Sequence, residues 1–185
     1  MKLLIMRHAD TEWSKMGFLS YTDIGLSDAG RQRAEEAAKN LSGSDIESVV
    51  TSPLARASET AGIIGSALGV SVKCDKRLEE VNFGIFEGLS REEAREKFPS
   101  EFSARESDKW NYAVKNGESY RDASRRVVEF MGTLRERKTL AVTHATLMKV
   151  FFVVRCGISL KDAERELIEP CSCFGLEGGA CKRLL

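Results

Sequence analysis

The chain has 185 residues, of which 42% are hydrophobic and 30% charged, and this predicts one soluble globular domain over residues 1–185. Its 28 basic residues balance its 28 acidic ones, so the overall charge gives no reason to expect nucleic acid or an anionic membrane as a partner. No apolar run approaches the length of a signal-sequence core or a membrane span, and we therefore expect a cytoplasmic protein.

The first predicted element is a strand at Lys2–Met6, because a short continuous apolar run is typical of a strand buried on both faces. Arg7 and His8 follow directly at its carboxyl end. Small apolar residues then recur every three or four positions after Ser27, which predicts a helix that begins there and ends near Gly43.

A second strand and helix follow in the same order. The strand is predicted at Glu47–Ser52 and the helix at Pro53–Gly69, with a stripe of apolar residues along one face. Arg56 lies in the first turn of this helix. A further short strand is expected between Val70 and Leu78.

The segment 84–117 has no clear periodicity, apart from one short helix expected near Arg91–Phe98. We predict that residues 85–117 form a lid that decides substrate specificity. The longest helix is predicted at Ser119–Glu136, because its apolar residues keep alternating spacings of three and four.

The last predicted elements repeat the alternation of strand and helix. A strand at Thr139–Thr143 ends at His144, and a helix is expected from about Leu147 to Cys156. In residues 171–185 a Gly-Gly pair separates two short extended runs, which favours a closing hairpin.

This alternation predicts a three-layer α/β/α sandwich with a mainly parallel central sheet. Ligands of such sheets bind at the carboxyl ends of the strands. The side chains of Arg7, His8, Arg56 and His144 stand at or just after such ends, so we expect them to converge in space although they are far apart in the sequence.

The five cysteines form an odd and irregularly spaced set, so a disulfide framework is not expected and reduced thiols agree with a cytoplasmic location. Cys171 and Cys173, together with Cys181, could suggest a metal or redox site. A zinc centre takes four ligands, however, and no histidine lies near these cysteines in the sequence. We therefore predict structural, reduced cysteines and no metal site.

The four converging side chains predict an anion pocket, since guanidinium groups grip phosphate oxygens and a helix start offers further N–H donors. The chain contains only two histidines, and both belong to this group. A neutral imidazole in such a pocket can attack phosphorus directly and form a phosphohistidine. This chemistry requires neither a metal nor a cofactor.

Five stretches of the chain carry a family resemblance. They are LLIMRHADTEW, TSPLARASETA, RLEEVNFGIFEG, GESYRDASRRV and VTHATLMKV, in this order between Leu3 and Val150. The series resembles the motifs of the histidine phosphatase superfamily, the phosphoglycerate mutase-like proteins. Any one of them is common in proteins, but five in this order and spacing are specific.

The resemblance implies a role for each matching residue. His8 would be the nucleophile that becomes phosphohistidine. Arg7, Arg56 and His144 would hold the phosphoryl oxygens and stabilise the charge that develops on them, with His144 counted as catalytic.

Glu80 stands at what looks like the family's acid position, four residues before Gly84. It would protonate the leaving alkoxide and then activate water. Glu79 and Glu87 are alternatives for this role, because they lie in the same acidic stretch.

Some positions depart from the family's usual pattern. Ala9 replaces a glycine, and Ser14 replaces an asparagine that helps to hold phosphate in many members, so Ser14 is a candidate phosphate-binding residue. The segment Val81–Asn116 is also shorter than the insertion usual in cofactor-dependent phosphoglycerate mutases.

We therefore predict a metal-independent phosphomonoester hydrolase that acts on a small phosphorylated metabolite, as a monomer or homodimer. A phosphoglycerate mutase is the alternative within the same family. A non-catalytic or regulatory protein that binds a phosphorylated ligand is the alternative of another class, and the complete set of site residues counts against it.

Overall fold

The computed structural model describes residues 3–13, 18–20, 22–135 and 137–185. Six strands form one sheet in the order β3-β2-β4-β1-β5-β6. They are β1 (Leu3–Arg7), β2 (Ser48–Thr51), β3 (Val72–Cys74), β4 (Thr139–Thr143), β5 (Cys173–Glu177) and β6 (Ala180–Arg183). The first four strands are parallel, whereas β5 and β6 form the expected antiparallel hairpin at one edge. The mainly parallel sheet is therefore confirmed.

Seven α-helices lie in the described ranges, together with two short 3₁₀ turns, η1 (Lys76–Leu78) and η2 (Gly84–Phe86). The helices are α2 (Asp28–Asn40), α3 (Ala55–Leu68), α4 (Arg91–Lys97), α5 (Pro99–Ser107), α6 (Tyr120–Thr133), α7 (Ala145–Cys156) and α8 (Leu160–Arg165). None of these helices is both long and apolar enough to cross a membrane.

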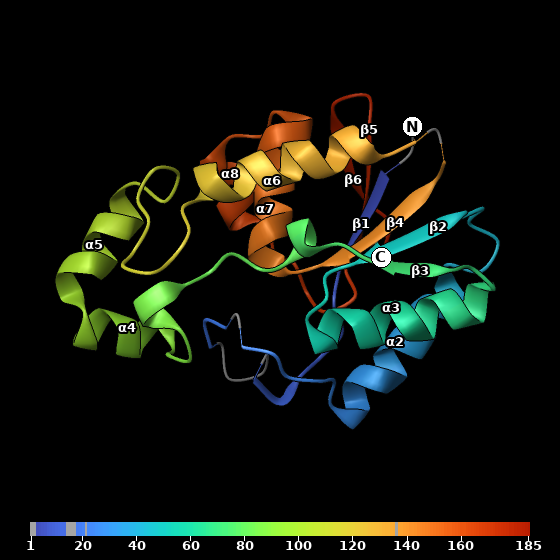
Figure 1. The fold of residues 1–185 in the computed structure, drawn as a ribbon, viewed down its shortest axis with the longest axis horizontal. Coiled ribbons are helices and arrows are strands. Elements are labelled where there is room, and N and C mark those ends of the chain that lie inside the picture. Colours follow the sequence, from blue (N-terminus) through green and yellow to red (C-terminus); the bar gives the residue numbers. More distant parts are fainter. Residues whose placement is uncertain (1–2, 14–17, 21, 136) are drawn as a thin grey trace.

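Helices cover both faces of the sheet, which confirms the three-layer arrangement. Figure 1 shows α2 and α3 on one side of the strands and α6, α7 and α8 on the other. Alternate residues of β1 explain why both faces are covered: Leu3 and Ile5 pack in the cluster with α6 and α7, whereas Leu4 and Met6 pack in the cluster with α2 and α3.

The helix starts follow the capping residues in the sequence. Ser27 accepts a hydrogen bond from the Gly30 N–H at the start of α2, and Ser119 forms a capping box with Asp122 at the start of α6. The predicted start of α7 at Leu147 is late by two residues, because the helix follows His144 directly.

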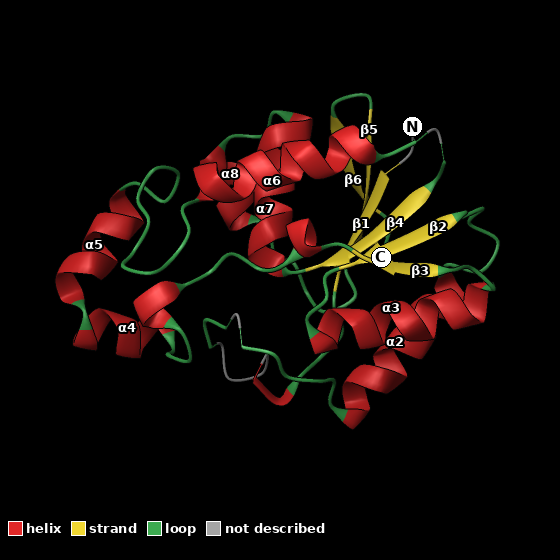
Figure 2. Cartoon of the chain, in the orientation of Figure 1, coloured by secondary structure: helices red, strands yellow, loops and turns green. Residues whose placement is uncertain are grey.

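The segment between η2 and α6 is more regular than its sequence suggests. It contains α5, which begins at Pro99 and was not predicted. Figure 2 shows α4 and α5 set apart from the sheet and its covering helices. A small separate core that includes Phe83, Phe86 and Phe102 holds the segment together, and Leu19 packs against it. Its function as a lid stays a prediction.

The expectation of reduced cysteines is wrong for one pair. Cys156 at the end of α7 and Cys181 on β6 form a disulfide, with their Cα atoms 5.9 Å apart. The closing hairpin brings Cys181 against the helix end, and sequence spacing alone cannot show this proximity. Cys171 and Cys173 are buried free thiols, and burial raises the pKa of each to about 12, which agrees with a structural role.

Candidate active site

His8 and His144 lie side by side because of the register between two neighbouring strands. β1 and β4 pair in parallel with Arg7 opposite Thr143, so a histidine follows at the end of each strand. The backbone N–H of His8 donates to the backbone carbonyl of Thr143 at 2.9 Å. The centroids of the two imidazole rings are 5.1 Å apart. Both rings therefore lie at the carboxyl edge of the sheet, where ligands of such folds bind.

The surroundings of His8 define which of its nitrogens carries the proton. Nδ1 lies 2.7 Å from the Ala9 carbonyl oxygen, and a carbonyl oxygen can only accept a hydrogen bond. In the neutral ring Nδ1 therefore carries the proton and Nε2 keeps its lone pair. Burial, followed by the charges of Arg7 and Arg56, holds the pKa of His8 well below its usual value of 6.5. The ring is consequently neutral at pH 7.

His144 is completely buried and has a different partner. Its Nε2 lies 2.9 Å from the Ser52 hydroxyl, while its Nδ1 has no hydrogen-bond partner among the described residues. Burial, followed by His8 and Arg56, holds the pKa of His144 well below 6.5. Sequence reasoning missed Ser52, although it follows β2, the strand next to β4, and this position is the signal that could have found it.

Two guanidinium groups lie at the same edge of the sheet. Arg7 ends β1 and donates from Nη1 to the Ile168 carbonyl at 2.7 Å, whereas its buried Nε has no partner in the described part of the chain. Arg56, in the first turn of α3, donates to the carbonyls of Thr22 at 2.7 Å and Ser20 at 3.1 Å. Burial lowers the pKa of both arginines, and both remain charged at pH 7.

Glu80 is held by the first turn of α7. Its carboxylate accepts backbone N–H groups from Val81 at 2.8 Å, Leu147 at 3.0 Å and Thr146 at 3.2 Å. The positive end of the helix dipole also favours a carboxylate at this place. The side chain is thus fixed in one position although it follows a short 3₁₀ turn rather than a long element.

The structure separates Glu80 from the two other candidate carboxylates. Glu80 lines the cavity next to His8, whereas Glu79 and Glu87 are not part of its wall. Glu87 instead accepts hydrogen bonds from the backbone N–H and the hydroxyl of Thr22, both at 2.7 Å. Of the three, Glu80 is therefore the one placed to exchange a proton with a bound ligand.

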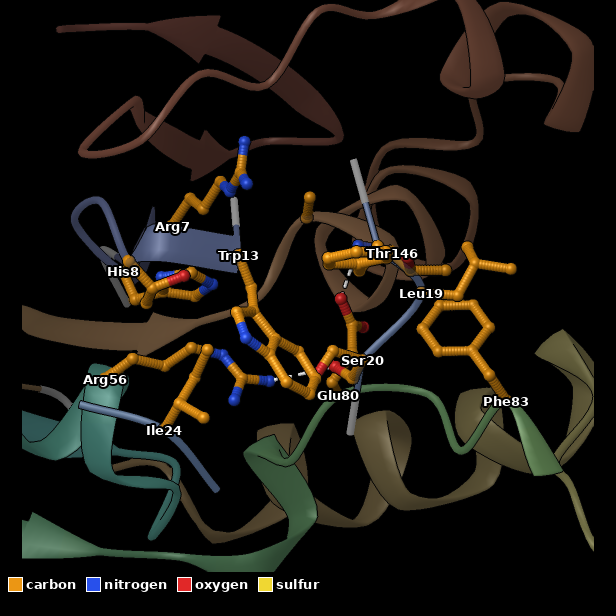
Figure 3. Close-up of a pocket in the computed structure, with 13 residues that line it drawn as sticks. Arg7, His8, Trp13, Leu19, Ser20, Ile24, Arg56, Glu80, Phe83 and Thr146 are labelled. Atoms are coloured by element: carbon orange, nitrogen blue, oxygen red, sulfur yellow. Dashed lines mark hydrogen bonds between the residues drawn. The ribbon is translucent and has the colours of Figure 1, made fainter. Parts of the chain in front are cut away.

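Arg7, His8, Arg56 and Glu80 line one cavity of about 140 Å³, while His144 is buried beside His8. Figure 3 shows these four side chains arranged around the same space. Two fixed cations beside two neutral imidazoles form an arrangement that can hold an anion with several oxygens. Within the described ranges, no three His, Cys, Asp or Glu side chains come together in a way that could hold a metal ion.

The rest of the described cavity wall combines apolar side chains with hydroxyl groups, and sequence reasoning did not identify it. Besides Ala145 of α7 and the hydroxyl residues Thr11, Ser20 and Thr146, the wall has five larger apolar residues, namely Trp13, Phe18, Leu19, Ile24 and Phe83. They come from an irregular segment after β1 and from the start of the small separate core, where no periodic pattern marks them as neighbours. The predicted phosphate ligand Ser14 lies outside the described residues.

Comparisons with known proteins place the chain in a family. Residues 3–184 match the family model of the histidine phosphatase superfamily (branch 1). The chain is similar to phosphoserine phosphatase 1 of Hydrogenobacter thermophilus, with 29% identity over 86% of this chain and 78% of that protein. It is 33% identical to a 6-phosphofructo-2-kinase/fructose-2,6-bisphosphatase of Gallus gallus over 80% of this chain, although it spans only 31% of that larger protein.

Solved structures give the same result. The structure of Bacillus stearothermophilus YhfR is 26% identical, with a TM-score of 0.83 over 98% of this chain and 94% of the other. Because the family model covers nearly the whole sequence and the fold agrees, this chain is a member of the histidine phosphatase superfamily.

Proposed function

We propose that the protein is a phosphatase that hydrolyses monoesters of a small phosphorylated metabolite, with His8 as the nucleophile. The observation that carries this proposal is the neutral imidazole of His8. Its proton is committed to the Ala9 carbonyl, its Nε2 keeps a lone pair, and the residue lines a cavity together with two arginines. Membership of the superfamily supports it, and the phosphatase names of the relatives agree with a small phosphorylated substrate.

The first step transfers the phosphoryl group to the protein. Nε2 of His8 attacks phosphorus and forms the P–N bond while the P–O bond to the leaving group breaks. Arg7 and Arg56 stabilise the charge on the phosphoryl oxygens. His144 adds a donor through Nδ1 when the Ser52 hydroxyl donates to its Nε2.

Glu80 acts on the leaving group in this step and on water in the next. In its protonated form the Glu80 carboxyl passes a proton to the departing alkoxide. The resulting carboxylate then takes a proton from water as this water attacks the phosphohistidine. A new P–O bond forms, the P–N bond breaks, and His8 regains its lone pair.

The proposed reaction uses only side chains of the chain, and we therefore infer that it needs no metal or cofactor. The test is hydrolysis of a panel of phosphomonoesters with and without EDTA, alongside His8→Asn. We expect the rates of hydrolysis to be unchanged in EDTA. In the His8→Asn variant we expect the rate to fall by at least about a thousandfold. Activity that disappears with the chelator, or persists in His8→Asn, would refute the mechanism.

The same assay separates hydrolysis from the mutase alternative. Phosphoryl transfer between the hydroxyls of phosphoglycerate, in place of transfer to water, would identify a mutase. A purified protein that binds phosphomonoesters without turning them over would instead indicate a regulatory binding protein.

Cellular location and oligomeric state stay predictions, namely cytoplasmic and monomer or homodimer. The Cys156–Cys181 disulfide is an observation against the first of these, because disulfides persist mainly in oxidising compartments.

A further inference from the structure

Besides Arg7, His8, Arg56 and Glu80, the described cavity wall consists of apolar side chains and three hydroxyl residues, and this composition bears on substrate choice. We infer that the site selects phosphomonoesters of uncharged, apolar or aromatic alcohols and discriminates against esters that carry a carboxylate or an ammonium group. The inference rests on the phosphatase function proposed above and names the substrate class of the same site.

The direction of displacement defines which residues meet the leaving group. In an in-line reaction the leaving oxygen lies on the side of phosphorus opposite the attacking Nε2 of His8. Glu80, which must reach this oxygen, marks that side of the cavity. Figure 3 shows Leu19, Phe83 and Thr146 on the side of Glu80 away from His8. The alcohol part of the substrate therefore contacts an aliphatic side chain, an aromatic ring and the side chain of Thr146.

The aromatic wall extends beyond these residues. Trp13 also lines the cavity, and its ring meets the Phe18 ring edge to face, with centroids 5.5 Å apart. Such flat apolar surfaces bind hydrocarbon or aromatic groups through burial and ring contacts.

The charged groups of the described wall are already engaged. Arg56 donates to two backbone carbonyls and Arg7 to a third, and both are needed for the phosphoryl oxygens. Glu80 accepts three backbone N–H groups. Among the described residues, the wall holds no further arginine, lysine, aspartate or glutamate. A carboxylate or ammonium on the leaving group would thus lose its hydration without gaining a counter-ion from the described part of the wall.

The apolar wall is built before substrate arrives. The Leu19 N–H donates to the Leu89 carbonyl at 2.9 Å, and the Leu19 carbonyl accepts the Gly88 N–H at 2.8 Å. Phe83 belongs to the small core next to η2 and is 4% exposed. Because both side chains are held by structure outside the cavity, little ordering accompanies binding, and the apolar surface is available as a fixed recognition surface.

The test compares two substrates that differ only in a distant charge. Benzyl phosphate and 4-carboxybenzyl phosphate share the ester bond and the ring, so their kcat/KM ratio reports the charge preference of the wall. We expect wild-type protein to favour benzyl phosphate by about 100-fold. Glucose 6-phosphate, whose alcohol is uncharged but polar, should also be the poorer substrate.

A charge introduced into the wall gives the reverse test. Leu19→Lys should shift the ratio toward 4-carboxybenzyl phosphate by about tenfold, because it supplies the missing counter-ion. Val128→Lys is the matched control, since Val128 lies 53% exposed on α6, outside the cavity wall, and its replacement should leave the ratio unchanged. The wild-type ratio decides the question even if Leu19→Lys fails to fold.

The outcomes distinguish this inference from the proposed function. Equal or better hydrolysis of 4-carboxybenzyl phosphate or glucose 6-phosphate, with His8→Asn inactive, would overturn the substrate class and leave the phosphatase in place. Hydrolysis of none of the three substrates, or hydrolysis that survives in His8→Asn, would overturn both.

Discussion

At the scale of single residues, the two histidines differ in how their protons are held, and this difference supports the separate roles proposed for them. The Nδ1 proton of His8 is bound by the Ala9 carbonyl, which leaves Nε2 with the lone pair that the proposed nucleophile needs. His144 contacts the Ser52 hydroxyl, a group that can donate or accept, and suits a donor to the phosphoryl oxygens. The neighbouring arginines favour the neutral form of both rings.

Glu80→Gln tests the proposed proton transfer. The amide cannot supply a proton, so we expect kcat for benzyl phosphate to fall by between about a hundredfold and ten-thousandfold. The rate constant of the first step with 4-nitrophenyl phosphate should fall much less, because the 4-nitrophenolate leaving group departs without a proton. Single-turnover kinetics of both substrates measure this contrast. Glu79→Gln is the matched control, and an equal loss with both substrates or with both variants would contradict the role of Glu80.

At the scale of elements, an ion pair outside the cavity holds the segment that carries Glu80. Arg126 on α6 pairs with Glu118 through Nε at 2.8 Å and Nη2 at 2.9 Å. The same guanidinium donates to the backbone carbonyls of Arg77 and Glu79, both at 2.7 Å, and of Glu80 at 3.2 Å. A single side chain on α6, a helix of 14 residues like α3, thus holds the turn before the candidate acid.

Arg126→Gln should therefore impair catalysis without touching substrate. We expect kcat to fall between about tenfold and a hundredfold, because small displacements of a catalytic group are costly, while KM changes little. Arg125→Gln is the matched control, since Arg125 lies next to it on α6 with its side chain 69% exposed. Equal steady-state kinetics for the two variants would show that Arg126 does not position Glu80.

The disulfide gives a second prediction at this scale. It closes a sequence separation of 25 residues between α7 and β6, and chain entropy assigns about 3.5 kcal/mol of stability to such a cross-link. Urea unfolding with and without dithiothreitol should show this difference in wild type and none in Cys156→Ser. Five free thiols in the unreduced protein, counted by mass spectrometry after alkylation, would contradict the pairing.

The elements also show what the sequence could and could not predict. The buried strands and the longer helices follow from apolar runs, helical spacing and Ser27 or Ser119 caps, which are local signals. The disulfide and the partner of His144 depend on which strands and helices become neighbours, and no local signal carries this. The apolar wall was missed for the same reason, since Leu19 and Phe83 meet only in the folded chain.

At the scale of the whole molecule, the buried neutral histidines couple stability to pH. The pKa of His8 and of His144 is well below 6.5 in the folded protein, whereas both titrate near 6.5 when unfolded. Below this pH the unfolded chain binds protons that the native state does not, so stability decreases as the pH falls from 6.5 toward the folded pKa values.

We expect the free energy of unfolding to decrease by up to about 1.4 kcal/mol per pH unit for each histidine between pH 6.5 and 5. Urea unfolding at a series of pH values measures this slope. His8→Asn should remove about half of it. A slope near zero in wild type would show that the histidines are not buried in their neutral form.

The central claim, that His8 carries the phosphoryl group, is tested most directly by trapping the intermediate. A rapid acid-free quench of the protein with 4-nitrophenyl phosphate, followed by peptide mass spectrometry and phosphorus NMR, locates the label. We predict an acid-labile phosphate on Nε2 of His8 that is absent from His8→Asn. A phosphate on another residue, or turnover with no phosphorylated protein at any time, would contradict the account.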